Sequence, residues 1–181
     1  KSVTAMFSAI EPEPDTDPET DRIWVEAEAG DIAAPLQTGL DALASGGAFV
    51  YSQYGTGGYV DFLFEIVDPG EYVVWGRVIG ATSGSDSFFV SMDNDTEQIW
   101  DVARTSTWEW DRVSVRGGAD PSVFYLAAGY HTLRIFQRET GARLDRLLIT
   151  SDMDYVPTGL GETAAGSTFS LNVSVSGSGS V

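Results

Sequence analysis

The chain has 181 residues, of which 43% are hydrophobic, 27 are acidic and 10 are basic, so the formal net charge is −17. This length and apolar content fit one folded domain with flanking tails, and the charge argues against nucleic acids and anionic membrane surfaces as partners, because like charges repel. With no cysteine, the chain has no disulfide, no thiolate metal site and no cysteine nucleophile.

The chain divides by composition into two tails and a central block. Residues 10–21 interleave three prolines with six acidic residues, a composition typical of an extended linker. We therefore interpret residues 1–21 as the end of a preceding module and a linker, and residues 22–152 as one strand-rich domain. Residues 153–181 contain a second Gly-rich linker followed by an alternating segment, which we interpret as the start of another β module.

The central block consists of short segments with strand-like alternation, separated by turn sequences such as Asp68-Pro69-Gly70. The predicted strands are residues 23–28, 48–51, 59–66, 71–78, 87–92, 98–102, 109–115, 130–137 and 143–150. We expect residues 59–66 and 71–78 to pair as a hairpin, and residues 35–43 to hold a short helical turn. Many short strands without a long amphipathic helix predict an all-β fold, a β-sandwich of the jelly-roll type.

Three carboxylates fall within predicted strands. Glu26 and Glu28 are two residues apart in the first strand, so we expect them on the same face, where they repel each other unless a cation or donors balance them. Asp145 supplies a third carboxylate from the last strand. Because Ca²⁺ prefers several oxygen ligands, the three residues predict a structural calcium site. The alternative is a surface ion pair between one of the glutamates and Arg143 or Arg146.

Over about 130 residues the order of these segments resembles the carbohydrate-binding modules of families 6 and 35. The motifs that carry the resemblance include Val25-Glu26-Ala27-Glu28, Gly58-Tyr59-Val60-Asp61, Trp75-Gly76-Arg77-Val78, Thr107-Trp108-Glu109-Trp110 and Ala142-Arg143-Leu144-Asp145. The resemblance implies a galactose-binding-domain-like jelly roll. It also implies a structural Ca²⁺ held by Glu26, Glu28 and Asp145, with backbone oxygens from the loop near Ser45.

The resemblance further implies a sugar site in the loops at one edge of the sandwich. The ring that stacks on the sugar would be Trp108, and the second aromatic would be Phe49 or Tyr51. A polar residue, often Asn, stands two before the calcium Asp in such modules; here it is Arg143, whose planar fork favours carboxylate or sulfate and so indicates an anionic polysaccharide. We expect Trp108 to point outward and Trp110 to point into the core.

Arg138 and Glu139 are further candidates near the predicted site. They either clamp a ligand or form an internal ion pair at the end of a strand.

The resemblance implies a non-catalytic, secreted module of a bacterial multimodular protein. Such a module would tether an attached glycoside hydrolase or polysaccharide lyase to its substrate. We expect a monomer whose partners are a polysaccharide and the neighbouring domains of its own chain. The alternatives are a structural or adhesive spacer that binds no sugar and, less favoured, a glycosidase or lyase that uses paired carboxylates as acid and base.

Overall fold

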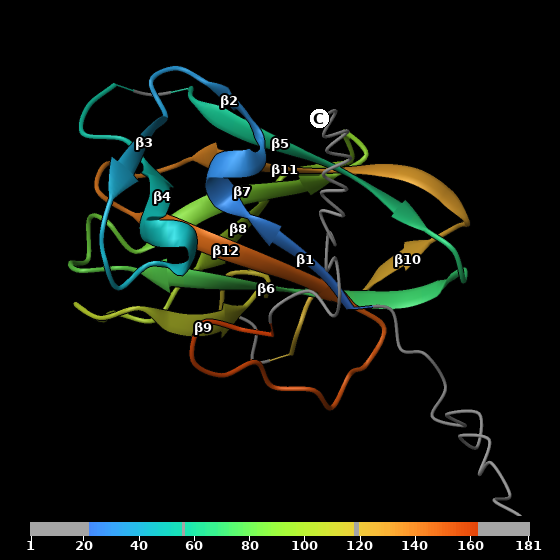
Figure 1. Ribbon diagram of the computed structural model, residues 1–181. Helices are drawn as coiled ribbons and strands as arrows, with labels where there is room; N and C mark the ends of the chain where they lie inside the picture. Colours follow the sequence, from blue (N-terminus) through green and yellow to red (C-terminus); the bar gives the residue numbers. More distant parts are fainter. Residues whose placement is uncertain (1–21, 56, 118–119, 163–181) are drawn as a thin grey trace, which may run out of the picture.

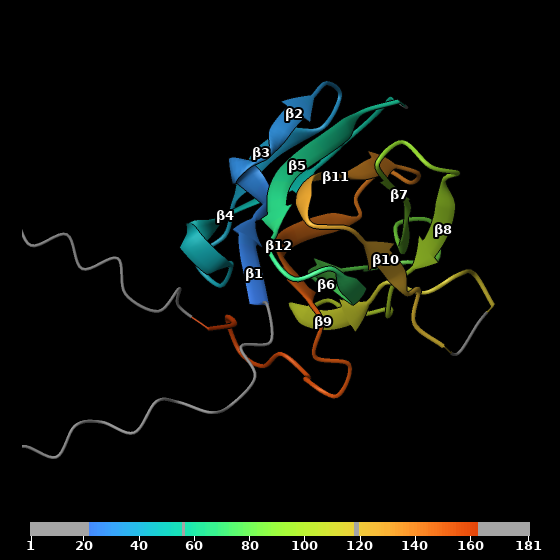
Figure 2. The same cartoon turned by 90° about the vertical axis from the view of Figure 1, so that its right-hand side faces the viewer.

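The computed structural model describes residues 22–55, 57–117 and 120–162; the predicted tail segment 1–21 lies outside this range, as does the part of the predicted segment 153–181 from residue 163 onward. Two antiparallel sheets face each other across one core (Figure 1, Figure 2). The predicted all-β jelly-roll sandwich is confirmed. Within the described residues, no helix has the length and apolar character needed to cross a membrane.

The larger sheet contains both the first and the last strand of the domain. Its path is β10-β6-β12-β4-β3, with β1 paired to β12 and β9 paired to β6. These strands are β1 (Arg22–Glu26), β3 (Gln37–Leu40), β4 (Ala48–Tyr51), β6 (Gly70–Ile79), β9 (Glu109–Arg112), β10 (Phe124–Leu126) and β12 (Arg143–Thr150). Two short 3₁₀ turns, η1 (Ala27–Ala29) and η2 (Ser45–Gly47), follow β1 and precede β4.

The smaller sheet has five strands in the order β2-β5-β11-β7-β8. They are β2 (Asp31–Ala33), β5 (Tyr59–Ile66), β11 (Gly129–Gln137), β7 (Ser87–Met92) and β8 (Gln98–Asp101). Side chains alternate between core and solvent along these strands, as β5 shows in its regular change from buried to exposed positions.

The core between the sheets is built around Trp100, which is fully buried. Its indole Nε1 donates a hydrogen bond of 2.9 Å to Asp111, so the polar edge of the ring is satisfied. On β6, Gly76 makes room for this ring, because a Cβ at Gly76 would lie 2.4 Å from the indole. The sheets are therefore closely packed at the centre of β6.

The predicted hairpin between residues 59–66 and 71–78 is wrong. The two segments form β5 and β6, but β5 pairs with β2 and β11 in the smaller sheet, whereas β6 pairs with β9, β10 and β12 in the larger one. Residues 67–69 thus carry the chain across the sandwich. Alternation shows that a strand has one apolar face. It does not show whether the next strand pairs with it in the same sheet or packs against that face from the opposite sheet.

The predicted helical turn at residues 35–43 is also wrong, since this segment contains β3. β3 pairs with β4, and Gly39 lies under the ring of Phe49, where a Cβ would be only 2.5 Å from the ring. Packing against the aromatic ring and the edge of β4 therefore decides the structure of a segment whose own composition gives little strand signal.

After β12 the chain turns back over the outer face of the larger sheet. Residues 151–162, here called the C-terminal strap, are seen in red below β6 and β9 in Figure 1. The strap covers a second apolar cluster that includes Trp24, Trp75 and Leu148. Trp110 Nε1 donates to the Gly159 carbonyl at 3.2 Å. The packed part of the chain thus extends past residue 152 to Glu162.

Candidate functional site

Three aromatic side chains form a row on the outer surface of the larger sheet. Phe49 and Tyr51 share one face of β4, and their ring centroids are 5.1 Å apart. Trp108, in the loop before β9, meets Phe49 in an edge-on contact with 5.5 Å between centroids. Phe49 is buried, whereas Tyr51 and Trp108 keep partly exposed surfaces. The structure therefore brings together the three rings that sequence analysis selected.

Arg143 lies beside this row because the first residue of β12 pairs with Tyr51 of β4. Its guanidinium carbon is 5.2 Å from the centroid of the Phe49 ring. Seven of the nine arginines in the described residues form an ion pair; Arg143 and Arg112 do not. Arg143 thus presents a cation next to an aromatic surface in a strongly acidic protein.

The expectation that Trp108 and Trp110 point to opposite faces is wrong. Residues two apart in an extended strand share a face, and here both indoles lie on the outer side of the larger sheet. Trp110 meets Trp24 edge-on at 5.6 Å in the cluster under the strap, outside the main core. Trp108 is held differently, since its Nε1 donates to the Asp41 carboxylate at 3.1 Å.

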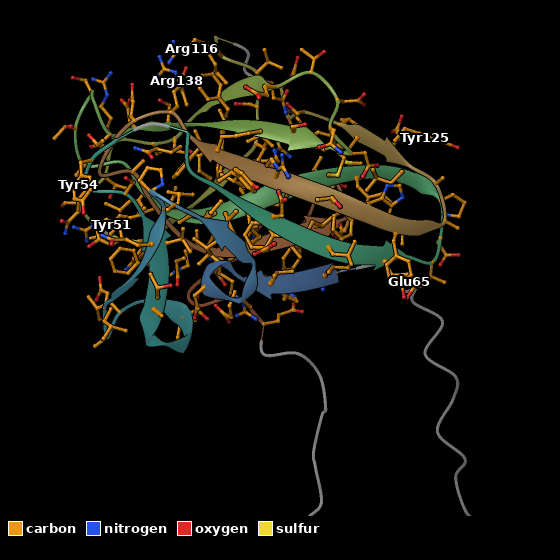
Figure 3. The ribbon with its side chains drawn as sticks, turned by 90° about the horizontal axis from the view of Figure 1, so that it is seen from above. Tyr51, Tyr54, Glu65, Arg116, Tyr125 and Arg138 are labelled. Atoms are coloured by element: carbon orange, nitrogen blue, oxygen red, sulfur yellow. The ribbon has the colours of Figure 1, made fainter. Side chains whose placement is uncertain are left out.

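Arg138 and Glu139 form an ion pair with each other, with 2.5 Å between Nη1 and Oε1. Arg138 also donates to Ser87 Oγ, and Glu139 accepts from the backbone N–H of Asp86. Figure 3 shows Arg138 at a distance from Tyr51. Of the two roles considered from the sequence, the contacts correspond to the internal ion pair.

The three predicted metal-site carboxylates lie close to η2. β1 ends at Glu26 and Glu28 lies in η1, so the expected continuous strand is wrong at its last two residues. Ser45 connects the site, because its N–H donates to Asp145 Oδ1 and its hydroxyl donates to Glu26 Oε1, both at 2.8 Å. A Cβ at Gly46 would lie 3.0 Å from Glu28 Oε1. The 3₁₀ turn is thus shaped around the carboxylates.

The carboxylates of Glu26, Glu28 and Asp145 lie close together and are partly removed from water, which raises the pKa values of Glu28 and Asp145. Burial raises the pKa of Glu28, and the neighbouring carboxylates of Glu26 and Asp145 raise it further. Burial likewise raises the pKa of Asp145, although hydrogen bonds from Arg77 and Ser45 oppose the shift. Glu26 Oε2 and Glu28 Oε2 are buried and accept no hydrogen bond. Two unpartnered buried carboxylate oxygens fit the preference of a hard cation such as Ca²⁺.

Two arginines share these carboxylates. Arg77 of β6 pairs with Asp145, and Arg146 Nε lies 3.2 Å from Glu26 Oε1. Among the residues that the structure describes, no group of three His, Cys, Asp or Glu side chains is arranged to hold a metal ion. As positioned, the site is therefore a set of carboxylates balanced in part by two guanidinium groups.

Sequence reasoning missed several residues around Trp108. Asp41, Leu43, Arg77 and Ile79 join Trp108 in lining a pocket of about 460 Å³, which Gly159 and Leu160 of the strap also line. Nothing in their local sequence marks them, because the site is assembled from four separate segments. Arg77 had one signal that could have been used, a charge at an apolar position of a buried strand.

No protein-family model and no curated protein matches the sequence. Among solved structures, the chain is similar to a family 35 carbohydrate-binding module from Clostridium thermocellum, with a TM-score of 0.59, 20% identity and coverage of 71% of this chain and 98% of the module. It is also similar to the C-terminal family 6 module of a marine laminarinase from Zobellia galactanivorans, with a TM-score of 0.55, 19% identity and coverage of 72% and 99%.

The chain has the fold of these modules. A Podospora anserina β-(1,4)-mannanase that carries a family 35 module is similar as well, with a TM-score of 0.60 and 16% identity over 75% of this chain and 29% of the enzyme. The chain thus spans nearly all of the isolated family 35 and family 6 modules but under a third of the enzyme. The predicted galactose-binding-like fold is confirmed by this likeness.

Proposed function

We propose that this chain is a non-catalytic module that binds an acidic polysaccharide on the surface formed by Tyr51, Phe49, Trp108 and Arg143. The observation that carries the proposal is the position of Arg143. It lies beside three aromatic rings and pairs with no carboxylate in the described residues, although the protein has 17 more negative than positive charges.

The chemistry of this surface suits a sugar acid. The exposed parts of Tyr51 and Trp108 offer apolar faces on which the C–H face of a pyranose can stack. Arg143 supplies a planar fork of donors for a carboxylate or sulfate. The likeness to family 35 and family 6 carbohydrate-binding modules supports a carbohydrate ligand, and the acidic character of the ligand is inferred from Arg143. Binding in this way would hold an attached polysaccharide-degrading enzyme near its substrate in a secreted multimodular protein.

We also propose that Glu26, Glu28 and Asp145 hold a structural Ca²⁺. The two unpartnered glutamate oxygens and the raised pKa of Glu28 support this proposal. The ion would supply positive charge to carboxylates that are costly to bury together. A catalytic role for this group is disfavoured because Asp145 has no exposed surface and cannot contact a substrate.

The experiment is titration calorimetry of the protein with polygalacturonate and with a neutral galactan, using two variants and a control. Trp108→Ala should weaken binding of the acidic polymer by at least about tenfold, which corresponds to about 1.4 kcal/mol. Arg143→Gln should weaken binding of the acidic polymer by a similar factor, because charge-assisted hydrogen bonds contribute about 1.5–3 kcal/mol. It should leave the affinity for the neutral galactan unchanged. Tyr125→Ala removes an exposed aromatic ring on β10 and should change nothing.

Melting curves of the variants should match that of the wild type, so that lost binding is not lost folding. If the wild-type protein binds no acidic polysaccharide, the spacer alternative stands and the proposal fails. Release of reducing sugar by the isolated chain would instead establish the enzyme alternative.

A further inference from the structure

The pocket next to the aromatic row is a separate feature from the surface proposed above. It shares only Trp108 with that surface, since Phe49, Tyr51 and Arg143 do not line it. Its volume of about 460 Å³ is in the range of small-molecule sites in proteins. The residues that determine the chemistry of the pocket include Asp41, Leu43, Arg77, Ile79, Trp108 and Leu160.

The walls of this pocket are apolar. Leu43 and Leu160 are 72% and 52% exposed, and they stand on separate segments, the loop before η2 and the strap. Together with Ile79 and the indole of Trp108 they form a concave apolar surface, of the kind that a ligand covers. The strap, which sequence analysis assigned to a linker, thus contributes one wall.

Asp41 gives the pocket a hydrogen-bond acceptor that disfavours an anionic ligand, beside the hydroxyl-bearing Ser106 and Thr107. The Asp41 carboxylate is oriented by the Leu43 N–H at 2.9 Å and by Trp108 Nε1 at 3.1 Å. These two donors, together with the positive charges of Arg143 and Arg77, hold the pKa of Asp41 below its ordinary value, so it is ionised and accepts from a hydroxyl group. A carboxylate ligand would be repelled by it.

Arg77 does not reverse this preference. Its guanidinium is buried in the floor, where Nη1 donates to the Leu43 carbonyl and pairs with Asp145, which balances its charge. Its Nε is buried and has no hydrogen-bond partner. The pocket therefore combines apolar walls with an acceptor for hydroxyl groups, whereas the adjoining surface carries the unpaired cation of Arg143.

We propose that this pocket is a second subsite, which takes a neutral sugar unit with an apolar edge, such as a 6-deoxyhexose, linked to the acidic unit bound at Arg143. Trp108 lies between the two subsites and contacts both units. The inference rests on the proposed function and deepens it. The ligand is then an acidic heteropolysaccharide in which a uronic acid is joined to a neutral, partly apolar unit.

The test uses three probes in titration calorimetry: glucuronic acid, rhamnose, and the disaccharide in which glucuronic acid is linked to rhamnose. The wild-type protein should bind the disaccharide at least tenfold more tightly than either monosaccharide. Leu43→Ser should abolish this gain and leave the affinity for glucuronic acid unchanged. Leu63→Ser is the matched control, because Leu63 is 71% exposed on β5 of the other sheet.

The outcomes separate the two proposals. If the wild-type protein binds neither the probes nor any acidic polysaccharide, the proposed function itself fails. If it binds glucuronic acid but gains nothing from the linked rhamnose, the second subsite is refuted and the acidic site stands. Equal affinities of the Leu43→Ser and Leu63→Ser variants for the disaccharide would also refute the subsite, as would a loss of glucuronic acid binding in Leu43→Ser.

Discussion

Asp145 and Arg77 form a buried ion pair beneath the candidate sites. Asp145 has no exposed surface, and its two oxygens accept hydrogen bonds from the Ser45 N–H and from Arg77. Such a pair contributes little net stability relative to an apolar pair, but removing one partner strands a charge in the interior. Arg77 thus has two roles, since it balances Asp145 and forms the floor of the pocket beside Trp108.

This arrangement predicts that Arg77→Met is strongly destabilising. The substitution keeps most of the side-chain volume but, in chelator, leaves Asp145 buried without a counterion, so the free energy of unfolding measured at pH 7 in chelator should fall by about 3–5 kcal/mol. Urea denaturation measures the change. Arg116→Met is the control, since Arg116 forms a solvent-exposed pair with Asp101, and its loss should have little or no effect. Similar small losses in both variants would contradict the prediction.

At the scale of elements, local sequence pattern was sufficient for the long strands. β5, β7 and β12 begin and end at the predicted residues because each is a run of six or eight residues rich in apolar side chains, and the short β4 was predicted as well because its four residues are all apolar or aromatic. The short strands β2, β3 and β10 were missed. Unlike β4, the segments of β2 and β3 hold few apolar residues, and the three residues of β10 are too short a run to predict a strand; all three form because a neighbouring edge offers backbone partners.

The sequence could predict those residues of the candidate sites whose side-chain type by itself suggests a binding or metal-ligating role. A tryptophan in a loop and a pair of glutamates drew attention by themselves, whereas Leu43, Ile79 and Leu160 are ordinary apolar residues in sequence. Their importance comes from the strap, whose return over the sheet depends on contacts between distant residues. Arg146 donates to the carbonyls of Leu160 and Glu162, and no local pattern reveals such bonds.

The attachment of the strap to β1 should depend on pH through Asp152. Its carboxylate pairs with Arg22 at 2.9 Å, and that hydrogen bond lowers the pKa of Asp152 below its ordinary value of 3.8. A lowered folded-state pKa gives stability that is present above the unfolded value and is lost as pH falls through the folded value. The pair therefore stabilises the strap at neutral pH, and this contribution starts to decline below about pH 3.8 and is lost only when pH falls through the lowered folded-state pKa.

Asp152→Asn tests this expectation. Asn keeps an oxygen that can accept from the N–H groups of Asp154 and Tyr155, as Asp152 Oδ1 does, but it cannot form the ion pair. The melting temperature should fall by roughly 1–3 °C at pH 7, since partly exposed pairs are weak, and the difference from wild type should shrink progressively as pH is lowered below 3.8. Asp154→Asn changes an exposed neighbour and should show no such dependence. A difference that stays constant while pH is lowered from 7 to well below 3.8, as far as the wild type remains folded, would refute the mechanism.

At the scale of the whole molecule, the candidate calcium site lies where the first and last strands meet. β1 and β12 pair along the whole length of β1, from Arg22 opposite Thr150 to Glu26 opposite Arg146. The carboxylates come from β1, η1 and β12, and Arg146 connects Glu26 to the strap. A cation held here would join segments that are more than a hundred residues apart in sequence, so its binding should stabilise the domain as a unit.

Calcium should therefore raise the melting temperature, and Glu28→Gln should remove that response. At a Ca²⁺ concentration one hundred times the dissociation constant, binding to the folded state alone adds about 2.7 kcal/mol to the free energy of unfolding. In chelator, Glu28→Gln should be at least as stable as the wild type, because the neutral amide removes a desolvated charge from between two other carboxylates.

Scanning calorimetry in Ca²⁺ and in chelator measures both effects, with Glu65→Gln, an exposed glutamate of β5 (Figure 3), as the matched control that should keep the full response. Both variants lose one negative charge, so a general effect of charge removal would alter both calcium responses equally. Only Glu28 lies beside two other acids, whereas Glu65 faces solvent, so a loss of response in Glu28→Gln alone points to the site. A wild-type melt that is the same in Ca²⁺ and in chelator would refute the metal site. A calcium response that survives in Glu28→Gln would place the ion on other ligands.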